Sequence, residues 1–252
     1  MRIMSLVPST TETLFALGVG DAVVGRTAFC VLPTEALTVP EVGGTKTPNL
    51  ARIVALRPDL ILVNAEENRA EDVGTLMRVA PVHSFYPRTV EHAIADLRVL
   101  GRLVGRTAGG ETLAAQARGL LAEVHAAAKP FRYAYLIWMR PWMVAAGGTY
   151  VADFLAQAGG VNVFADAAIP YPAITLDDLF DRGPDVVFLS SEPYPFAERH
   201  VDELARLSPR PDFWRQRIRL VDGRACGWHG VALLDGLGWL ARFSLAYQAQ
   251  ND

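Results

Sequence analysis

The sequence predicts an α/β fold of two lobes, each a small and mostly parallel sheet flanked by helices, with a ligand cleft between them. Three observations carry this prediction. Apolar residues recur at helical spacing over residues 107–128, which predicts one long rigid helix. Short apolar runs alternate with helical patterns on both sides of it. The segments NLARIVALRPDLILVNAEE and TLDDLFDRGPDVVFLSSE each predict a helix, a Pro-Asp turn, a buried strand and polar residues ending in Glu. We therefore expect a first lobe over residues 1–104, a connecting helix over 105–130 and a second lobe over 131–252.

In the first lobe, apolar runs predict strands at residues 2–7, 21–25, 60–63 and 82–85. Helical patterns follow Pro8 and cover residues 49–56, 71–79 and 89–104. Ser9 or Thr10 is the expected N-cap of the helix after Pro8, with Glu12 placed to complete a capping box. Asn49 is the expected cap of the next helix.

The long helix is expected to begin near Gly110 or Glu111 and to end before Lys129 and Pro130, because proline cannot continue a helix. In the second lobe, we expect strands at residues 133–139, 186–189 and 218–221. Helices are expected at residues 150–158, 175–180 and 231–247, and a loop at residues 140–143.

Composition excludes several classes of protein. The chain has 252 residues and a net charge of -3, so no basic surface favours nucleic acid or an anionic membrane. No apolar run reaches the roughly 18 residues of a transmembrane helix. Residues 43–48 lack the spacing of a phosphate-binding loop, and residues 18–20 lack the third glycine of a dinucleotide site. Cys30 and Cys226 lie far apart in the sequence and form no metal-like pair, and we expect free thiols rather than a disulfide.

The chain begins directly with a strand, without a basic segment and an apolar segment of a secretory signal. We therefore expect either a cytosolic protein or one whose leader has been removed.

Polar and aromatic residues follow the predicted strands, at the sheet edge where open α/β folds bind ligands. The candidate ligand-binding residues on this basis are Phe29, Asn64, Glu66, Trp142, Met143, Tyr171, Glu192, Tyr194, Trp228 and His229. Apolar rings combined with a few polar groups suit a bulky organic ligand. Alternatives stay open: Trp142 and Met143 could be core residues, and Glu66 could be a solvated surface residue. His229 could be structural, solvent-facing or an axial ligand to a metal centre.

Motifs of catalysis are missing from the sequence. It contains no G-x-S-x-G elbow, no H-E-x-x-H and no H-x-H, and its five histidines are scattered. We therefore predict a binding protein rather than an enzyme, with no catalytic residue, no protein metal site and no intrinsic cofactor.

The ordered set RIMSLVPSTTETLFALG, NLARIVALRPDLILV, DFLAQAGGVNVF, IPYPAITLDDL and GPDVVFL resembles the substrate-binding proteins of cobalamin and iron-siderophore ABC importers. These are the binding proteins with a helical backbone. The resemblance implies two α/β lobes joined by one rigid helix, limited closure on binding and docking onto a membrane permease. It also implies a periplasmic or cell-surface location.

The loop pattern is most similar to that of the cobalamin-binding branch, in which aromatic residues from both lobes hold the corrin ring. By position, the resemblance places Phe29 at a tyrosine of that branch, Met143 at a phenylalanine and Tyr171 at a tryptophan. Thr45 and Asn64 fall where the branch has tryptophans. The resemblance thus adds Thr45 to the candidate ligand-binding residues and implies a more polar wall in the first lobe.

The resemblance also implies permease docking through one acidic residue on each lobe, at the start of equivalent helices. Asp177 matches this position in the second lobe, whereas Ala51 occupies it in the first.

Three functional hypotheses follow. The first is a solute-binding protein for a corrinoid, a ferric siderophore or haem, which serves an ABC importer. The second is a cytosolic small-molecule carrier or sensor on the same fold, favoured by Ala51 and by the start of the chain. The third is a metal-handling enzyme that uses Glu66, Glu192 and His229.

Overall fold

Residues 1–251 are described in the computed structural model, and they fall into two units, each with its own sheet. The first unit comprises Met1–Pro87, Glu91–Gln116 and His229–Ala232. The second comprises Arg88–Val90, Ala117–Trp228 and the residues from Leu233 onward. Neither unit is a single continuous stretch of chain. The domain boundaries expected from the sequence stay a prediction.

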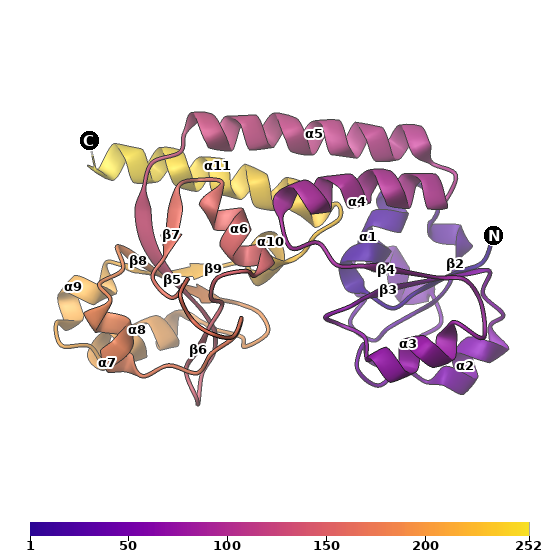
Figure 1. The fold of residues 1–252 in the computed structure, drawn as a ribbon, viewed down its shortest axis with the longest axis horizontal. Helices are drawn as coiled ribbons and strands as arrows, with labels where there is room; N and C mark the ends of the chain where they lie inside the picture. Colours follow the sequence, from indigo (N-terminus) through magenta and orange to yellow (C-terminus); the bar gives the residue numbers. More distant parts are fainter. Residues whose placement is uncertain (252) are drawn as a thin grey trace. The chain divides into compact units, whose positions relative to one another are not determined.

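The sheet of the first unit has four parallel strands in the order β2-β1-β3-β4. Its strands are β1 (Ile3–Ser5), β2 (Val23–Arg26), β3 (Leu60–Asn64) and β4 (Val82–Phe85). Its helices are α1 (Pro8–Ala16), α2 (Leu50–Ala55), α3 (Ala70–Leu76) and most of α4 (Val90–Leu103), with 3₁₀ turns at Gly20–Ala22 and Thr34–Thr38. Figure 1 shows α2 and α3 on one side of these strands and α1 and α4 on the other.

Both faces of this sheet are buried, which explains the uninterrupted apolar runs of its strands. Ile3 and Leu62 pack into one core cluster with Leu14 of α1 and Leu100 of α4. The neighbouring strand residues point to the opposite face, where they pack into a second cluster: Met4, Ile61 and Val63. The carboxyl ends of the four parallel strands meet at one edge of the sheet, where ligands bind in open α/β folds.

The second unit has a mixed sheet of five strands, in which β6, β5, β8 and β9 are ordered neighbours and β7 pairs with β5. Its strands are β5 (Phe131–Trp138), β6 (Met143–Val144), β7 (Gly160–Asn162), β8 (Val186–Ser190) and β9 (Ile218–Val221). Only the β5–β6 pairing is antiparallel among these described strands. Its helices are α6 (Tyr150–Ala156), α7 (Leu176–Asp181), α8 (Glu198–Arg206), α9 (Pro211–Arg215), α10 (Gly223–Gly227) and nearly all of α11 (Ala232–Asn251).

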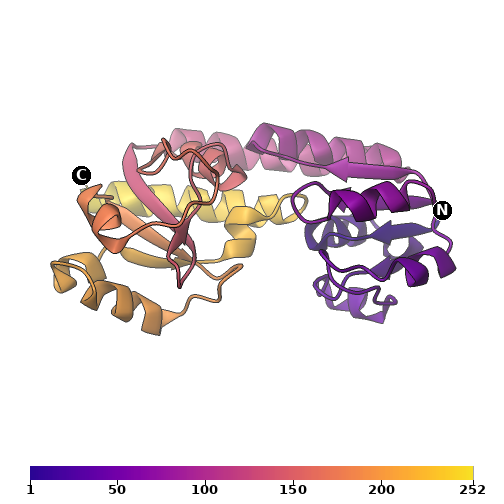
Figure 2. The same cartoon turned by 60° about the horizontal axis from the view of Figure 1, so that its bottom comes forward.

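Helices cover both faces of this sheet as well. On one face, Leu136 and Val187 share a core cluster with side chains of α7, α8 and α9. On the other, the ring of Phe188 lies 5.4 Å from that of Phe243 in α11. Figure 2 shows the orange helices 198–215 and the yellow helix α11 on opposite sides of the strands. The predicted fold class, two α/β units with mostly parallel sheets flanked by helices, is confirmed.

Helix α5 (Thr107–Ala126) runs from the first unit into the second, with the division after Gln116. It begins three residues before Gly110, so the predicted start was too late. Gly110 lies inside the helix, where α4 and α5 approach closely. A Cβ on Gly110 would lie 2.7 Å from the carbonyl oxygen of Leu97, and one on Gly101 would lie 2.9 Å from the Cα of Gly110.

Of the two helix caps predicted by residue, that of α2 was right and that of α1 was wrong. Asn49 accepts from the backbone N–H of Arg52 at the start of α2, and Thr175 caps α7 in the same way. In α1, however, the N-cap is Val7 and Pro8 is the first helical residue, so Ser9 is already inside the helix. Proline suits this first position because its φ is preset and its missing N–H has no helical partner there.

Sequence patterns missed several short elements of the second unit, namely β6, β7, α8, α9 and α10. Met143 was expected in a loop, but it lies in β6, because β6 pairs both with β5 and, through a bridge, with Ala173. Short strands such as this one form through pairing with other strands. A segment of two residues is too short to show a periodic pattern in the sequence.

Candidate ligand-binding site

Asn64 ends strand β3 in the first unit, and its side chain is almost fully buried. Its Oδ1 accepts from the backbone N–H of Glu66 at 2.8 Å, which fixes the loop that follows the strand. Because Oδ1 is used in this way, the amide nitrogen faces the other direction, where it lies 3.1 Å from Nε2 of His229. A polar residue at a strand end thus organises two segments that are distant in the sequence.

His229 lies in the first unit, although the chain on both sides of His229–Ala232 belongs to the second. An amide NH₂ only donates, so Nε2 of His229 must accept and the neutral ring carries its hydrogen on Nδ1. The hydroxyl of Ser9 also approaches Nε2, at 3.4 Å. Burial lowers the pKa of His229 to about 4, so the ring is neutral at physiological pH. Coordination of a metal through Nε2 would require the contact with Asn64 to break.

Residues 229–232 are held in the first unit by α1. The backbone N–H of Val231 donates to the hydroxyl of Thr13 at 2.9 Å. Gly230 has a φ of +71°, and a Cβ there would lie 2.2 Å from the Thr13 hydroxyl oxygen. Glycine is therefore required at this position by both conformation and space.

Three other predicted residues of the first unit have different environments. Thr45 is buried, and its carbonyl accepts from the side chain of Asn68 at 3.0 Å. Phe29 is 60% exposed, which is a large apolar surface for one side chain. Glu66 is exposed, and its carbonyl accepts from the Lys46 ammonium group.

Asn68 is a polar residue of this edge that the sequence analysis missed. Its Oδ1 accepts from the backbone N–H of Asn64 at 2.9 Å, while its amide nitrogen donates to Thr45. It therefore links two of the predicted residues. A single asparagine in a polar loop has no sequence pattern that would identify this role.

Aromatic side chains form a connected series at the carboxyl end of β5 in the second unit. The ring of Trp142 stacks on Phe196, with centroids 6.2 Å apart and planes 5° apart. Tyr194 lies 4.7 Å from Phe196 and 5.5 Å from Trp138. Trp138 is 40% exposed, so the last ring of the series is accessible to solvent. Sequence reasoning missed Trp138 because the predicted strand ran on to residue 139, which placed this tryptophan inside it.

Tyr171 and Met143 lie on neighbouring segments of the second unit. The carbonyls of Pro170 and Pro172 accept from the backbone N–H groups of Ala146 and Val144, at 2.9 and 3.2 Å. This pairing holds the segment beside β6. Tyr171 is 37% exposed, whereas Met143 is half-buried.

Glu192 follows strand β8, and its side chain is exposed. Its Oε2 accepts from the indole N–H of Trp228 at 2.8 Å. Two predicted residues that are 36 positions apart are therefore in direct contact.

The structure places Asp177 in the exposed first turn of α7, and Ala51 in the exposed first turn of α2. Both helices follow a side-chain cap, so these two positions are equivalent in their local structure. The first unit presents a methyl group where the second presents a carboxylate.

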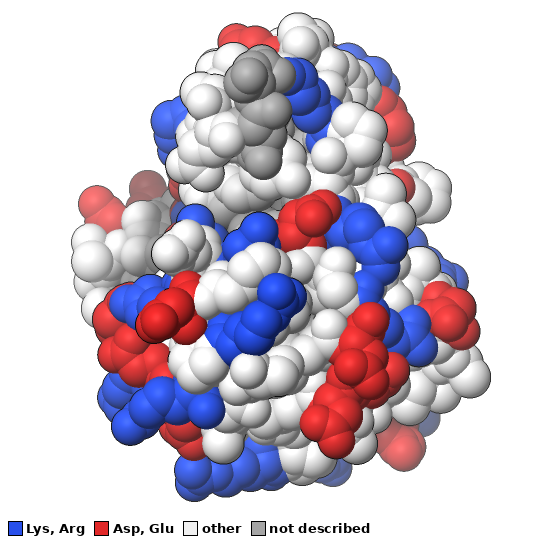
Figure 3. Space-filling model, turned by 90° about the vertical axis from the view of Figure 1, so that its left-hand side faces the viewer, with Lys and Arg blue, Asp and Glu red and all other residues white. Residues whose placement is uncertain are grey.

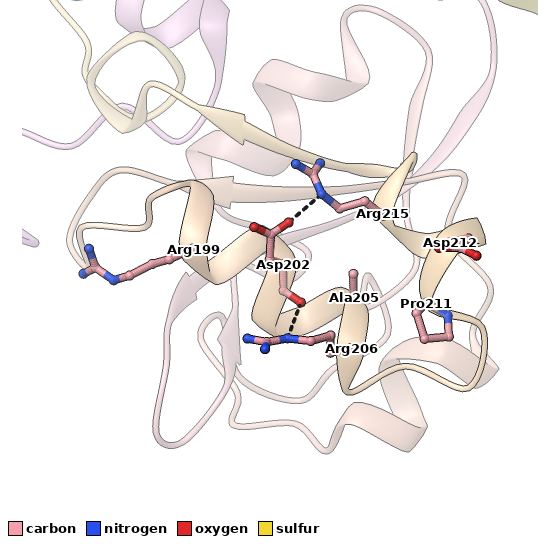
Figure 4. A pocket seen from close by; sticks show the side chains of 7 residues that line it. All are labelled: Arg199, Asp202, Ala205, Arg206, Pro211, Asp212 and Arg215. Carbon is pink, nitrogen blue, oxygen red and sulfur yellow. Dashed lines mark hydrogen bonds and ion pairs between the residues drawn. The ribbon is translucent and has the colours of Figure 1, made fainter.

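A groove of about 400 Å³ lies between α8 and α9, and none of the strand-end residues described above lines it. Figure 4 shows Asp202 between Arg215, whose side chain it pairs with at 2.7 Å, and Arg206. Arg215 also pairs with Glu198. Figure 3 shows positive and negative side chains interspersed over this end of the second unit. Within the lining, Asp202 and Arg215 satisfy each other, and we do not assign the groove a ligand.

Cys30 and Cys226 are both free, as expected, and both are buried. Within residues 1–251, no group of three or more His, Cys, Asp or Glu side chains could hold a metal ion. None of the helices in this part of the chain combines the length and the apolar character needed to cross a membrane.

Comparison with known families gives a match over most of the chain. The model of a family described as periplasmic binding protein matches residues 3–213. The chain belongs to this family. The predicted resemblance to binding proteins of the cobalamin and iron-siderophore type is confirmed by this family match and by the relatives of the chain.

Among its relatives is the vitamin B12-binding protein of Vibrio cholerae serotype O1, which is 28% identical over 193 residues, 75% of this chain and 70% of the relative. Two solved structures have the same fold. The periplasmic vitamin B12-binding protein of Vibrio cholerae has a TM-score of 0.83 and 22% identity, over 98% of this chain and 97% of that one. The apo form of a periplasmic haem-binding protein from Roseiflexus sp. RS-1 has a TM-score of 0.83 and 24% identity, over 97% and 98%.

These relatives are binding proteins and not enzymes, so the periplasmic binding protein described here is a solute-binding protein, as predicted. In the relatives, vitamin B12 or haem is a bound ligand rather than an intrinsic cofactor of catalysis. The enzyme hypothesis for Glu66, Glu192 and His229 has no support from them.

Proposed function

We propose that this protein captures a bulky metal chelate, a corrinoid, haem or a ferric siderophore, and delivers it to an ABC importer. The observation that carries the proposal is the aromatic series of the second unit. Trp138, Tyr194 and Trp142 lie at the carboxyl end of β5, connected through Phe196. A planar macrocycle buries a large apolar area against such rings.

Fixed geometry supports this role. Tyr194 contacts three other rings, those of Trp138, Phe196 and His200. Because these contacts already hold Tyr194 in place, its side chain loses little conformational freedom when a ligand stacks on it. The names of the relatives, which include vitamin B12-binding and haem-binding proteins, point to ligands of this size and shape.

Polar groups of the first unit complement the aromatic series. We propose that the neutral pair of Asn64 and His229, with Thr45 and Phe29, contacts the ligand from the first lobe. The remaining predicted residues, Glu66, Met143, Tyr171, Glu192 and Trp228, complete the proposed site. Neutral hydrogen-bonding groups suit a ligand whose rim carries amides or carbonyls.

Titration calorimetry tests the proposal. Purified protein is titrated with cobalamin, cobinamide, haemin and a ferric siderophore, and we expect saturable one-to-one binding of at least one of them. Tyr194→Ala should weaken that binding about tenfold, which corresponds to about 1.4 kcal/mol. Leu220→Ala, a change at an exposed position of β9, should leave the affinity unchanged. If none of the four ligands binds, the proposal is wrong.

We further propose that the protein acts in the periplasm or at the cell surface and docks onto its permease through Asp177. Support comes from the family, which is periplasmic, and from the exposed position of Asp177. Fractionation of the native cells with an antibody against the protein tests the location.

A second candidate function is a cytosolic carrier or sensor for the same class of ligand. It is favoured by α2, whose exposed residues include Ala51, Arg52 and Val54 but no acidic side chain. Recovery of the protein in the cytosolic fraction, together with intact chelate binding, would select this function over the importer.

A further inference from the structure

We propose that Glu192 makes the second unit select chelates whose rim carries amides or positive charge over chelates whose rim carries carboxylates. This inference rests on the proposed function, because it names the chemical class of ligand for the same site. It concerns the charge and the fixed position of one carboxylate.

The position of the Glu192 carboxylate is set by Trp228. The indole N–H donates to Oε2 at 2.8 Å. Trp228 directly follows α10, and its backbone N–H donates to the carbonyl of Arg224 at 3.0 Å. Asp222 caps the other end of this short helix. The tryptophan is therefore attached to an ordered element, and the exposed carboxylate is held toward it.

The backbone of Glu192 is fixed independently. The hydroxyl of Ser190 donates to the carbonyl of Glu192 at 2.6 Å, and this hydroxyl in turn accepts from Tyr135 at 3.0 Å. Gly223 packs against the same turn, where a Cβ would lie 2.7 Å from the backbone nitrogen of Glu192. The backbone that carries the carboxylate is therefore held at one point of the sheet edge.

The loop that carries Glu192 is joined to the strand end that carries the exposed ring of Trp138. Tyr194 is two residues after Glu192, and its backbone N–H donates to the carbonyl of Ile137 at 3.3 Å. This contact joins the loop to the end of β5, where Trp138 makes its edge contact with Tyr194. A ring stacked on this series would bring its rim substituents toward the carboxylate.

Rim chemistry then decides the affinity. An amide NH₂ donates to a carboxylate, and hydrogen bonds to an ionised acceptor are stronger than those between neutral groups. A rim carboxylate is repelled, and a fixed acceptor cannot turn away to avoid it. Corrinoid amides fit this environment, whereas haem propionates and anionic siderophores do not.

A matched pair of ligands tests the inference on the full chain. Cobinamide and cobyrinic acid share the corrin ring, but the first has amides at its rim and the second has carboxylates. We expect the wild-type protein to bind cobinamide at least about fivefold more tightly. Glu192→Gln should remove most of this ratio, mainly by improving the binding of cobyrinic acid.

Two further variants make the test specific. Trp228→Phe keeps an aromatic ring but removes the indole donor, so the ratio should fall part of the way. Glu123→Gln removes an exposed charge from α5 in the same unit and should leave the ratio unchanged. Melting temperatures establish that each variant is folded.

The outcomes separate this inference from the proposed function. If neither corrinoid, haemin nor a siderophore binds, the proposed function fails and the inference fails with it. If chelates bind but the wild-type protein does not distinguish the two rims, or Glu192→Gln leaves the ratio unchanged, the inference is wrong and the proposed function stands.

Discussion

The imidazole of His229 makes the stability of the first unit sensitive to acid. Its folded pKa of about 4 lies below the ordinary value of 6.5, because burial disfavours the charged form. The folded state therefore binds a proton less readily than the unfolded chain. The resulting contribution to stability is fully present above pH 6.5 and is lost as the pH falls from 6.5 toward 4.

Replacing His229 should flatten this dependence. We expect the free energy of unfolding of the wild-type protein to fall by about 1–2 kcal/mol more than that of His229→Gln between pH 7.5 and pH 5. Urea titrations at the two pH values measure the difference. His125→Gln, a change at an exposed site on α5, should behave like the wild type. Equal losses in His229→Gln and wild type would contradict the assigned environment.

The titration of Asp96, on α4, changes the stability with pH in the opposite direction. It lies with Thr10 and His229 around a cavity of about 10 Å³, room for one water molecule. Burial raises its pKa from 3.8 to about 6, while His92 lowers it to a smaller extent. Because the folded state holds the proton more tightly, the ionised carboxylate destabilises the fold above pH 6, and this penalty disappears at low pH.

Asp96→Asn should therefore stabilise the protein at neutral and alkaline pH. We expect a gain of about 1–2 kcal/mol at pH 8, and little gain at pH 4, where the wild-type carboxyl is already protonated. Thermal or urea unfolding at both pH values gives the comparison. Asp212→Asn, at an exposed position, serves as the control. A pH-independent effect would show that titration is not the cause.

For single residues, the sequence identified several members of the candidate site but not the residues that they contact. Asn64, Glu192 and Trp228 were predicted because they follow apolar runs or lie in loops. Their contacts, Asn64 with His229 and Glu192 with Trp228, join positions far apart in the chain. Such pairs depend on the tertiary path of the chain, which local patterns do not contain.

Two glycines of α5 differ in their surroundings and provide a test at the level of the helix. Gly110 lies against α4, where a Cβ would be 2.7 Å from a backbone oxygen. At Gly119, no atom of another described segment would lie within 4 Å of a Cβ. Gly110→Ala should destabilise the protein by about 1–3 kcal/mol through overpacking.

Gly119→Ala should instead stabilise the protein by about 0.5–1 kcal/mol, because alanine favours a helix and restricts the unfolded chain. Urea denaturation of the two variants gives opposite shifts if the packing of α4 on α5 is as described. The same sign for both would contradict this packing.

Prediction of elements succeeded where a segment was long or capped. Asn49 identified the start of α2, and the apolar runs identified β3, β4, β8 and β9. The start of α5 was misplaced because glycine has two opposite uses, ending a helix or allowing close approach of another one. Only the packing partner distinguishes these uses.

At the scale of the whole molecule, the proposed docking of a permease at Asp177 is tested by reversing charges on α7. We predict that Asp177→Lys abolishes ligand-dependent stimulation of the permease while leaving the affinity for the chelate unchanged. Asp181→Lys, at the other end of α7, should have a much smaller effect. Transport into vesicles containing the permease measures both. Full transport by Asp177→Lys would exclude this docking role.

The two-unit fold was predictable because its signals repeat along the chain. The interleaving of the units was not, because Arg88–Val90 and His229–Ala232 each carry too few residues for any pattern. Their assignment depends on single contacts, such as that of Val231 with Thr13.

The placement of His229–Ala232 also bears on the order of events during synthesis. The strands of the first unit leave the ribosome before those of the second, yet His229–Ala232 follow every strand of the second unit. Until these residues emerge, Thr13 and Asn64 lack their partners Val231 and His229. The nascent chain therefore carries an incomplete first unit while the whole sheet of the second is being made, and the unit that starts first cannot be finished first.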